Sequence, residues 1–117
     1  MKHAPGFLAV VDEARPRVSE ITIDAWLAAP NALLIDVRED DEWAAGRLPH
    51  AIHIGRGVLE RDIEAKVPDK GQALVLYCGG GYRSILAADS LQKMGYTNVR
   101  SLVGGIREWR DRGLAAG

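Results

Sequence analysis

Residues 73–77 form an uninterrupted apolar run, and a cysteine and three glycines follow it directly. A strand that is apolar on both faces is typical of the interior of a parallel sheet that helices cover on both sides. A second apolar run, at residues 32–37, reaches a polar residue, Asp36, near its end. Ligands of open parallel sheets bind outside the carboxyl ends of the strands. We therefore expect Asp36 and Cys78 to lie at the functional edge of a sheet.

Strand-like and helix-like segments alternate along the rest of the chain. This alternation predicts an α/β fold, and 117 residues are enough for one domain with a single core. Pro16 and Pro30 end the first two predicted helices, and Gly46 and Gly95 end two later ones. We expect further strands at 18–21, 51–54 and 99–103, and helices at 7–14, 22–28, 39–45, 58–67, 84–94 and between Gly105 and Gly113.

Residues 78–84 read Cys-Gly-Gly-Gly-Tyr-Arg-Ser and join the apolar strand to the start of a helix. Backbone amides of such a loop can turn toward the sulfur, and each hydrogen bond to a charged group contributes about 1.5–3 kcal/mol. The helix N-terminus adds partial positive charge, so the loop favours a thiolate without a neighbouring histidine. We predict that Cys78 is a nucleophile and that Arg83 offers a planar positive group to an anionic substrate. The alternative is a buried cysteine that only fills space beside a flexible glycine loop.

Composition and charge exclude several classes of partner and of cofactor. The net charge is −1, and no apolar run approaches the roughly 18 residues of a membrane span, so we expect neither nucleic acid nor membrane as partner. The N-terminal residues do not resemble a signal peptide. A single cysteine excludes an intrachain disulfide, and no cysteine and histidine spacing predicts a zinc site, so we expect no cofactor or metal. A reducing cytoplasm suits such a chain.

The motifs taken together resemble the rhodanese domain, a family of single-domain sulfurtransferases. The resemblance covers residues 18–114, and residues 1–17 form an N-terminal extension that we expect to hold one short helix. The matching pieces are Leu34-Ile35-Asp36-Val37-Arg38 with Glu42, then Gly46 to Ile54, Tyr77-Cys78 through Arg83-Ser84, Gly95-Tyr96 with Val99, and Leu102 through Gly104-Gly105 to Trp109.

The resemblance implies a fold, an activity and a set of site residues. The fold is a five-stranded parallel sheet flanked by helices. The activity is transfer of sulfane sulfur from a small-molecule donor, such as thiosulfate, to a thiol, cyanide or protein acceptor through a cysteine persulfide. Cys78 takes the role of the nucleophile, and the substrate and persulfide are held by Gly79, Gly80, Gly81, Tyr82 and Arg83.

Two departures from the family pattern bear on the activity. His50 stands where the family usually has a glycine, so the turn there is expected to differ. The loop also lacks basic residues directly after Cys78, which argues against thiosulfate as the physiological donor.

Two other classes of function compete with sulfur transfer. A phosphatase or arsenate reductase of the related kind needs a wider loop, whereas only four residues separate Cys78 from Arg83. A non-catalytic binding module would normally have lost the cysteine.

Several other polar residues allow both a structural and a functional interpretation. We favour a structural role for Asp36, which would cap a turn, and for Arg38, which would pair with Glu42 at i, i+4. Arg83 could instead point away from the loop and pair with an acid such as Asp36. His50 and His53 lack a third ligand, so a metal site is not expected.

Tyr82 could wall the pocket or face solvent, and Gly104-Gly105 could supply amides or only allow close packing. The three tryptophans are expected in the core or half-buried, and they are Trp26, Trp43 and Trp109.

Overall fold

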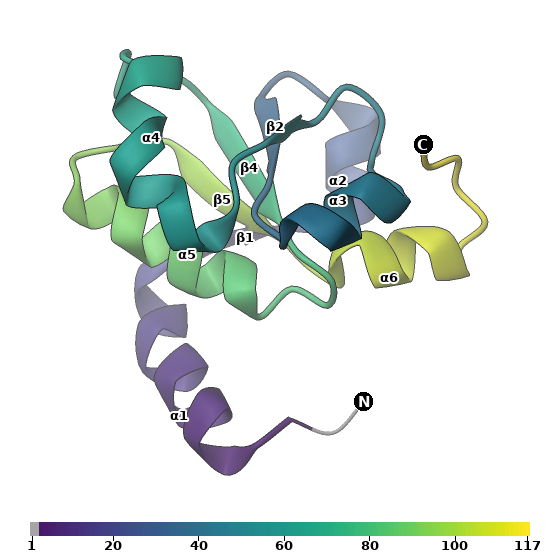
Figure 1. The fold of residues 1–117 in the computed structure, drawn as a ribbon, viewed down its shortest axis with the longest axis horizontal. Coiled ribbons are helices and arrows are strands. Elements are labelled where there is room, and N and C mark those ends of the chain that lie inside the picture. Colours follow the sequence, from purple (N-terminus) through teal and green to yellow (C-terminus); the bar gives the residue numbers. More distant parts are fainter. Residues whose placement is uncertain (1–2) are drawn as a thin grey trace.

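A parallel sheet forms the centre of the molecule in the computed structural model, which describes residues 3–117 (Figure 1). Within these residues the sheet has five strands in the order β1-β5-β4-β2-β3, and every adjacent pair is parallel. The fold predicted from the sequence is therefore confirmed. The strands are β1 (Ser19–Ile21), β2 (Leu33–Asp36), β3 (Ile52–His53), β4 (Leu74–Tyr77) and β5 (Val99–Leu102).

Each predicted helix is present, with bounds that differ from the prediction by one to a few residues. The first helix begins at Pro5, because proline is well suited to the first turn of a helix, where its missing N–H is not needed. The helices are α1 (Pro5–Ala14), α2 (Ile23–Ala28), α3 (Asp40–Ala45), α4 (Leu59–Lys66), α5 (Arg83–Lys93) and α6 (Gly105–Asp111), with short 3₁₀ helices at Arg15–Arg17 and Arg56–Val58.

The side chains of the central strand β4, and of Cys78 directly after it, alternate between two layers of the core on opposite faces of the sheet. Leu74, Leu76 and Cys78 face the layer that α1, α4 and α5 cover, whereas Val75 and Tyr77 face the layer under α2 and α6. All five side chains are at most 1% exposed. Burying a side chain of this size contributes about 1.5–3 kcal/mol, so both faces of β4 stabilise the fold. Cys78 follows this central strand directly, which places it at the carboxyl edge of the sheet.

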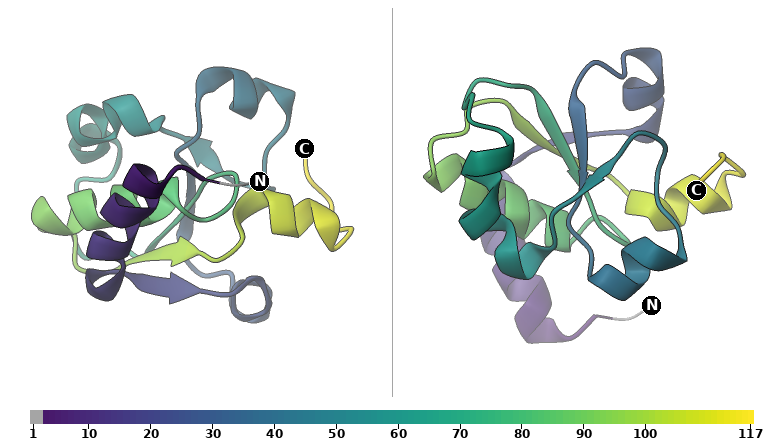
Figure 2. Two further views of the ribbon diagram at one scale, coloured as in Figure 1. Left: turned by 90° about the horizontal axis from the view of Figure 1, so that it is seen from below. Right: turned by 45° about the horizontal axis from the view of Figure 1, so that its top comes forward.

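The helix α1 lies alongside α5 on one face of the sheet (Figure 2). Its side chains Val11 and Ala14 are buried in the core. An ion pair of 2.8 Å joins Arg17, just after α1, to Asp89 of α5. His3, before α1, and Phe7, in its first turn, come close to the loop that precedes α5.

The helix α3 begins at a reciprocal cap. The Glu39 carboxylate accepts a hydrogen bond from the backbone of Glu42, and the Glu42 carboxylate accepts one from the Glu39 N–H. The acidic residues in the first turn also interact favourably with the helix dipole. This local sequence fixes Glu42 at the start of α3, beside the carboxyl edge of the sheet.

Candidate functional site

The Cys78 sulfur lies inside the loop that joins β4 to α5. Its Sγ atom accepts hydrogen bonds from the Gly81 N–H at 3.2 Å and from the Ser84 N–H at 3.4 Å. Cys78 is 1% exposed, and the first turn of α5 adds its partial positive charge. Two amides and a helix N-terminus thus converge on one sulfur atom, as the sequence of the loop predicted.

Two buried serines continue this network into the sheet. Ser84 Oγ lies 3.5 Å from Sγ and 2.7 Å from the Oγ of Ser101 on β5. Both serines are fully buried. Sequence reasoning did not assign Ser101, although a polar residue in the middle of a predicted buried strand was a signal that it has a partner.

The backbone of the loop is held by the start of α6. The N–H groups of Ile106 and Arg107 donate to the carbonyls of Cys78 and Gly79 at 3.0 and 2.9 Å. A Cβ on Gly105 would lie 2.7 Å from the Gly79 carbonyl oxygen, so this position accepts only glycine. The sequence left open whether Gly104-Gly105 supplies amides or allows close packing. For Gly105 the structure shows close packing of α6 against the loop.

A hollow of about 320 Å³ opens beside the sulfur. Tyr82 forms one wall, and its ring lies 4.5 Å from the ring of His3 and 6.2 Å from that of Phe7, centroid to centroid. His3 and Phe7 thus contribute directly to the surroundings of Cys78. The residues that line the hollow are His3, Phe7, Glu42, Cys78, Gly80, Tyr82, Arg83 and Arg107.

Arg83 lies at the rim of this hollow and pairs with an acid. Its two terminal nitrogens donate to the two carboxylate oxygens of Glu42 at 2.9 and 3.0 Å. This hydrogen bonding raises the pKa of Arg83 and lowers the pKa of Glu42 to about 2. The alternative that Arg83 pairs with an acid of the domain is therefore borne out, but the acid is Glu42 at the start of α3 and not Asp36, which pairs with Arg38.

Arg38 and Asp36 form a buried ion pair. Arg38 donates to both carboxylate oxygens of Asp36, with the shortest distance 2.7 Å, and to the carbonyl of Gly46 at 2.6 Å. The Asp36 carboxylate also accepts from the Arg38 N–H, so its predicted turn-capping role is confirmed. The predicted i, i+4 pair of Arg38 with Glu42 is wrong, since both side chains have these other partners.

The two histidines of the 50–53 segment lie apart from the sulfur. His53 stacks on Trp43 with ring centroids 5.0 Å apart, and its Nε2 lies 2.8 Å from the Arg38 carbonyl oxygen. His50 is exposed and has φ = 65°, so it adopts the left-handed conformation that a glycine would adopt without strain. Within residues 3–117, no group of three acidic, histidine or cysteine side chains could hold a metal ion.

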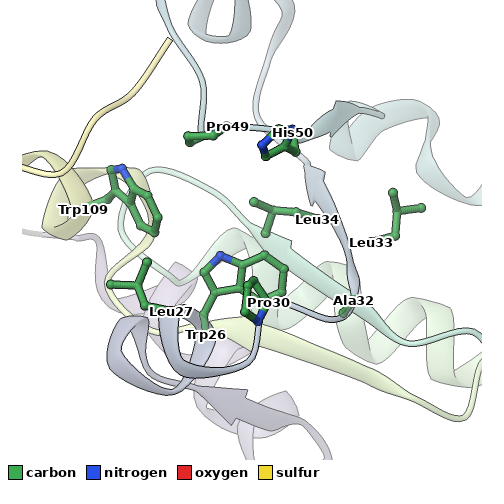
Figure 3. A pocket seen from close by; sticks show the side chains of 9 residues that line it. All are labelled: Trp26, Leu27, Pro30, Ala32, Leu33, Leu34, Pro49, His50 and Trp109. Atoms are coloured by element: carbon green, nitrogen blue, oxygen red, sulfur yellow. The ribbon is translucent and has the colours of Figure 1, made fainter.

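A second hollow, of about 390 Å³, is mainly apolar (Figure 3). Trp26 and Trp109 line it and are mostly buried, as predicted, while His50 lies at its edge. Cys78 and the residues of its loop do not line this hollow. A molecule that reacts with Cys78 would therefore bind in the smaller hollow beside Sγ and not in this apolar one.

Fold and loop together define an α/β domain with an amide-bound cysteine at the carboxyl edge of a parallel sheet. The model of the rhodanese-like domain family matches residues 22–112. The chain belongs to this family. The matched range starts after β1, so it does not include α1, whose Phe7 lies beside Tyr82.

Named relatives include a sulfurtransferase that the match covers almost completely. The human thiosulfate:glutathione sulfurtransferase is 32% identical over 109 residues, which cover 83% of this chain and 95% of that protein. A tRNA uridine(34) hydroxylase from Erwinia tasmaniensis is 31% identical over 99 residues, but these cover only 28% of its length. The likeness to the hydroxylase is thus confined to one part of a longer protein.

A solved structure with a very similar fold covers the entire chain. It is a protein of unknown function from Rhodopseudomonas palustris, described as a possible tyrosine phosphatase, with a TM-score of 0.85 and 30% identity over 100% of this chain and 98% of that one. Among the helices of residues 3–117, none is both long and apolar enough to cross a membrane.

Proposed function

We propose that this chain is a sulfurtransferase that moves sulfane sulfur from a donor such as thiosulfate to a thiophilic acceptor through a persulfide on Cys78. The observation that carries the proposal is the position of Cys78. Its Sγ lies beside an open hollow and accepts hydrogen bonds from the amides of Gly81 and Ser84. Amide donors stabilise negative charge on sulfur before the reaction and on the persulfide after it.

The reaction consists of two displacements at sulfur. The Cys78 thiolate attacks the outer sulfur of thiosulfate, the S–S bond of the donor breaks, and its electron pair leaves with sulfite. The acceptor, cyanide or a thiol, then attacks the outer sulfur of the persulfide, and the Cys78 thiolate leaves. Each step conserves charge and needs no oxidant, metal or cofactor. The loop residues that would surround the donor and the persulfide are Gly79, Gly80, Gly81, Tyr82 and Arg83, with the Arg83 guanidinium at the rim, where it pairs with Glu42.

The relatives support the choice of substrates. The name of the human relative specifies thiosulfate as one substrate and glutathione as the other. A sulfur-carrying small molecule and a small thiol are therefore the first donor and acceptor to test. Because the proposed nucleophile must remain reduced, a reducing compartment such as the cytoplasm suits this activity.

The second candidate function is phosphatase chemistry, which the description of the Rhodopseudomonas protein suggests. In that chemistry an arginine at the end of the loop binds the oxyanion together with the amides. Here only four residues separate Cys78 from Arg83, and Glu42 occupies both donor arms of Arg83. These contacts favour a sulfur atom over a phosphoryl group in the loop.

Two assays on the same protein separate these activities. The wild type is expected to form thiocyanate from thiosulfate and cyanide and to leave p-nitrophenyl phosphate unhydrolysed. Cys78→Ser should abolish thiocyanate formation while its circular dichroism spectrum stays that of the wild type. Thiocyanate formation that survives in Cys78→Ser would contradict the proposal, and so would phosphate ester hydrolysis without sulfur transfer.

A further inference from the structure

Two arginines lie over the cysteine loop, and they differ in their partners. A Cβ placed on Gly79 would lie 3.3 Å from an Nη atom of Arg83 and 3.6 Å from one of Arg107. The Arg83 guanidinium is engaged with both oxygens of Glu42. Arg107 is exposed, and within residues 3–117 its guanidinium makes no hydrogen bond or ion pair with protein. The positive group that remains free to bind a ligand is that of Arg107.

The position of Arg107 is fixed by the backbone of α6. Its own N–H donates to the Gly79 carbonyl at 2.9 Å, so the base of the side chain is attached to the cysteine loop. The guanidinium extends above Gly80, where an added Cβ would lie 2.8 Å from Nη1. Arg107 lines both the hollow that contains Cys78 and an adjacent one of about 230 Å³ that contains Gly79.

The charges around the Cys78 hollow leave one positive charge uncompensated. Its charged residues are Glu42, Arg83 and Arg107, with His3 as a further titratable group. Glu42 and Arg83 balance each other. The adjacent hollow shares Glu42 and Arg107 with this one, and its other charged residues are Arg38, which Asp36 balances, and the oppositely charged Arg110 and Asp111. An anion that approaches the sulfur therefore meets the field of Arg107.

We propose that Arg107 binds anionic reagents over Cys78 and, on the basis of the sulfurtransferase function proposed above, the anionic end of the sulfur donor. Thiosulfate and the Cys78 thiolate repel each other, and a guanidinium between Gly79 and Gly80 offsets this repulsion. Arg107 stays protonated throughout and takes no part in bond breaking. The loop needs no basic residue directly after Cys78, because α6 supplies one from another part of the sequence.

Alkylation of Cys78 tests this role without any reference to sulfur transfer. The chain has one cysteine, so iodoacetate, which is anionic, and iodoacetamide, which is neutral, report on the same sulfur. We expect Arg107→Ala to lower the ratio of the iodoacetate rate to the iodoacetamide rate by about tenfold, because one nearby positive charge is lost. Arg107→Lys should restore most of this ratio. Arg112→Ala is the matched control, because Arg112 lies at the end of α6 and pairs with Asp24.

The steady-state counterpart is a higher KM for thiosulfate in Arg107→Ala, with the KM for cyanide changed much less. A ratio of alkylation rates that Arg107→Ala leaves within about twofold of wild type would overturn the proposal, even in a protein that transfers sulfur. A tenfold lower ratio would support it even if thiosulfate proved not to be a substrate. The two proposals can therefore fail separately.

Discussion

Arg83 and Glu42 lie 41 residues apart in the sequence and are joined by two parallel hydrogen bonds of 2.9 and 3.0 Å. The pair connects the first turn of α5 to the first turn of α3. It holds Arg83 beside Gly79 and engages both terminal nitrogens of its guanidinium. The pair therefore ties the rim of the cysteine loop to the rest of the domain.

Glu42→Gln should change how stability depends on pH. The Arg83 hydrogen bonds lower the folded-state pKa of Glu42 to about 2 from an ordinary value of 4.5. The carboxylate thus stabilises the fold above about pH 4.5, and this contribution is lost as the pH falls toward 2. Since the pair is about one third exposed, with side-chain exposures of 33% and 34%, we expect only about 1 kcal/mol.

Urea unfolding between pH 7 and pH 3 measures this effect. The free energy of unfolding of Glu42→Gln should lie below that of wild type at pH 7 and approach it at low pH. A gap between the two proteins that stays constant over this range would show that the Glu42 charge contributes nothing.

Arg38→Ala should be the most destabilising of the arginine replacements. Arg38 is 3% exposed and Asp36 is 0% exposed, so removal of the guanidinium leaves a buried carboxylate and the Gly46 carbonyl without a partner. Breaking a buried pair in this way costs about 3–5 kcal/mol. The free energy of unfolding in urea measures the loss, and the double variant Asp36→Asn with Arg38→Met should recover part of it. A loss of less than about 1 kcal/mol would mean that water reaches the carboxylate.

The strands and helices were predictable because their apolar periods are local properties of the sequence. The run before Cys78 needs no partner to be recognised as a buried strand, and Gly46 marks a helix end by itself. The partners of Arg38 and Arg83 were not predictable in this way. An i, i+4 rule favours Glu42 for Arg38, whereas the buried Asp36 two residues away is the stronger acceptor once the sheet has formed.

Arg107 could not have been found from local sequence. It follows the two glycines at 104–105 and reaches the cysteine loop only because α6 begins against the carbonyls of Cys78 and Gly79. Which exposed arginine comes near which loop is a property of the tertiary packing. The sequence also predicted that several backbone amides donate hydrogen bonds to the sulfur, without saying which. Within residues 3–117, the amides that do so are those of Gly81 and Ser84.

The glycines of the loop should differ in their tolerance of alanine. Gly81 has φ = +94°, and an added Cβ would lie 3.0 Å from the Gly104 nitrogen, so Gly81→Ala strains the backbone by about 1–3 kcal/mol. Gly80 has no such φ, and its added Cβ would meet the flexible end of Arg107. The free energy of unfolding of Gly80→Ala should therefore lie within about 0.5 kcal/mol of the wild-type value. Equal losses of unfolding free energy in the two variants would refute this distinction.

The serines behind the sulfur should affect its reactivity according to their distance from it. Ser84→Ala removes the hydroxyl 3.5 Å from Sγ and leaves the buried Ser101 hydroxyl without that partner, which costs about 1–3 kcal/mol. We expect a slower reaction of Cys78 with iodoacetamide at neutral pH. Ser101→Ala leaves the nearer hydroxyl in place, so its alkylation rate should fall less. A larger rate loss in Ser101→Ala than in Ser84→Ala would contradict this order.

Mass spectrometry of the intact protein tests the proposed persulfide most directly. After exposure to thiosulfate and removal of excess donor, the wild type should gain the mass of one sulfur atom, and cyanide should remove it with release of thiocyanate. Because Cys78 is the only cysteine, Cys78→Ser should gain nothing under the same conditions. A wild type that gains no sulfur from thiosulfate or from other sulfane donors, or a Cys78→Ser protein that gains one, would contradict the account.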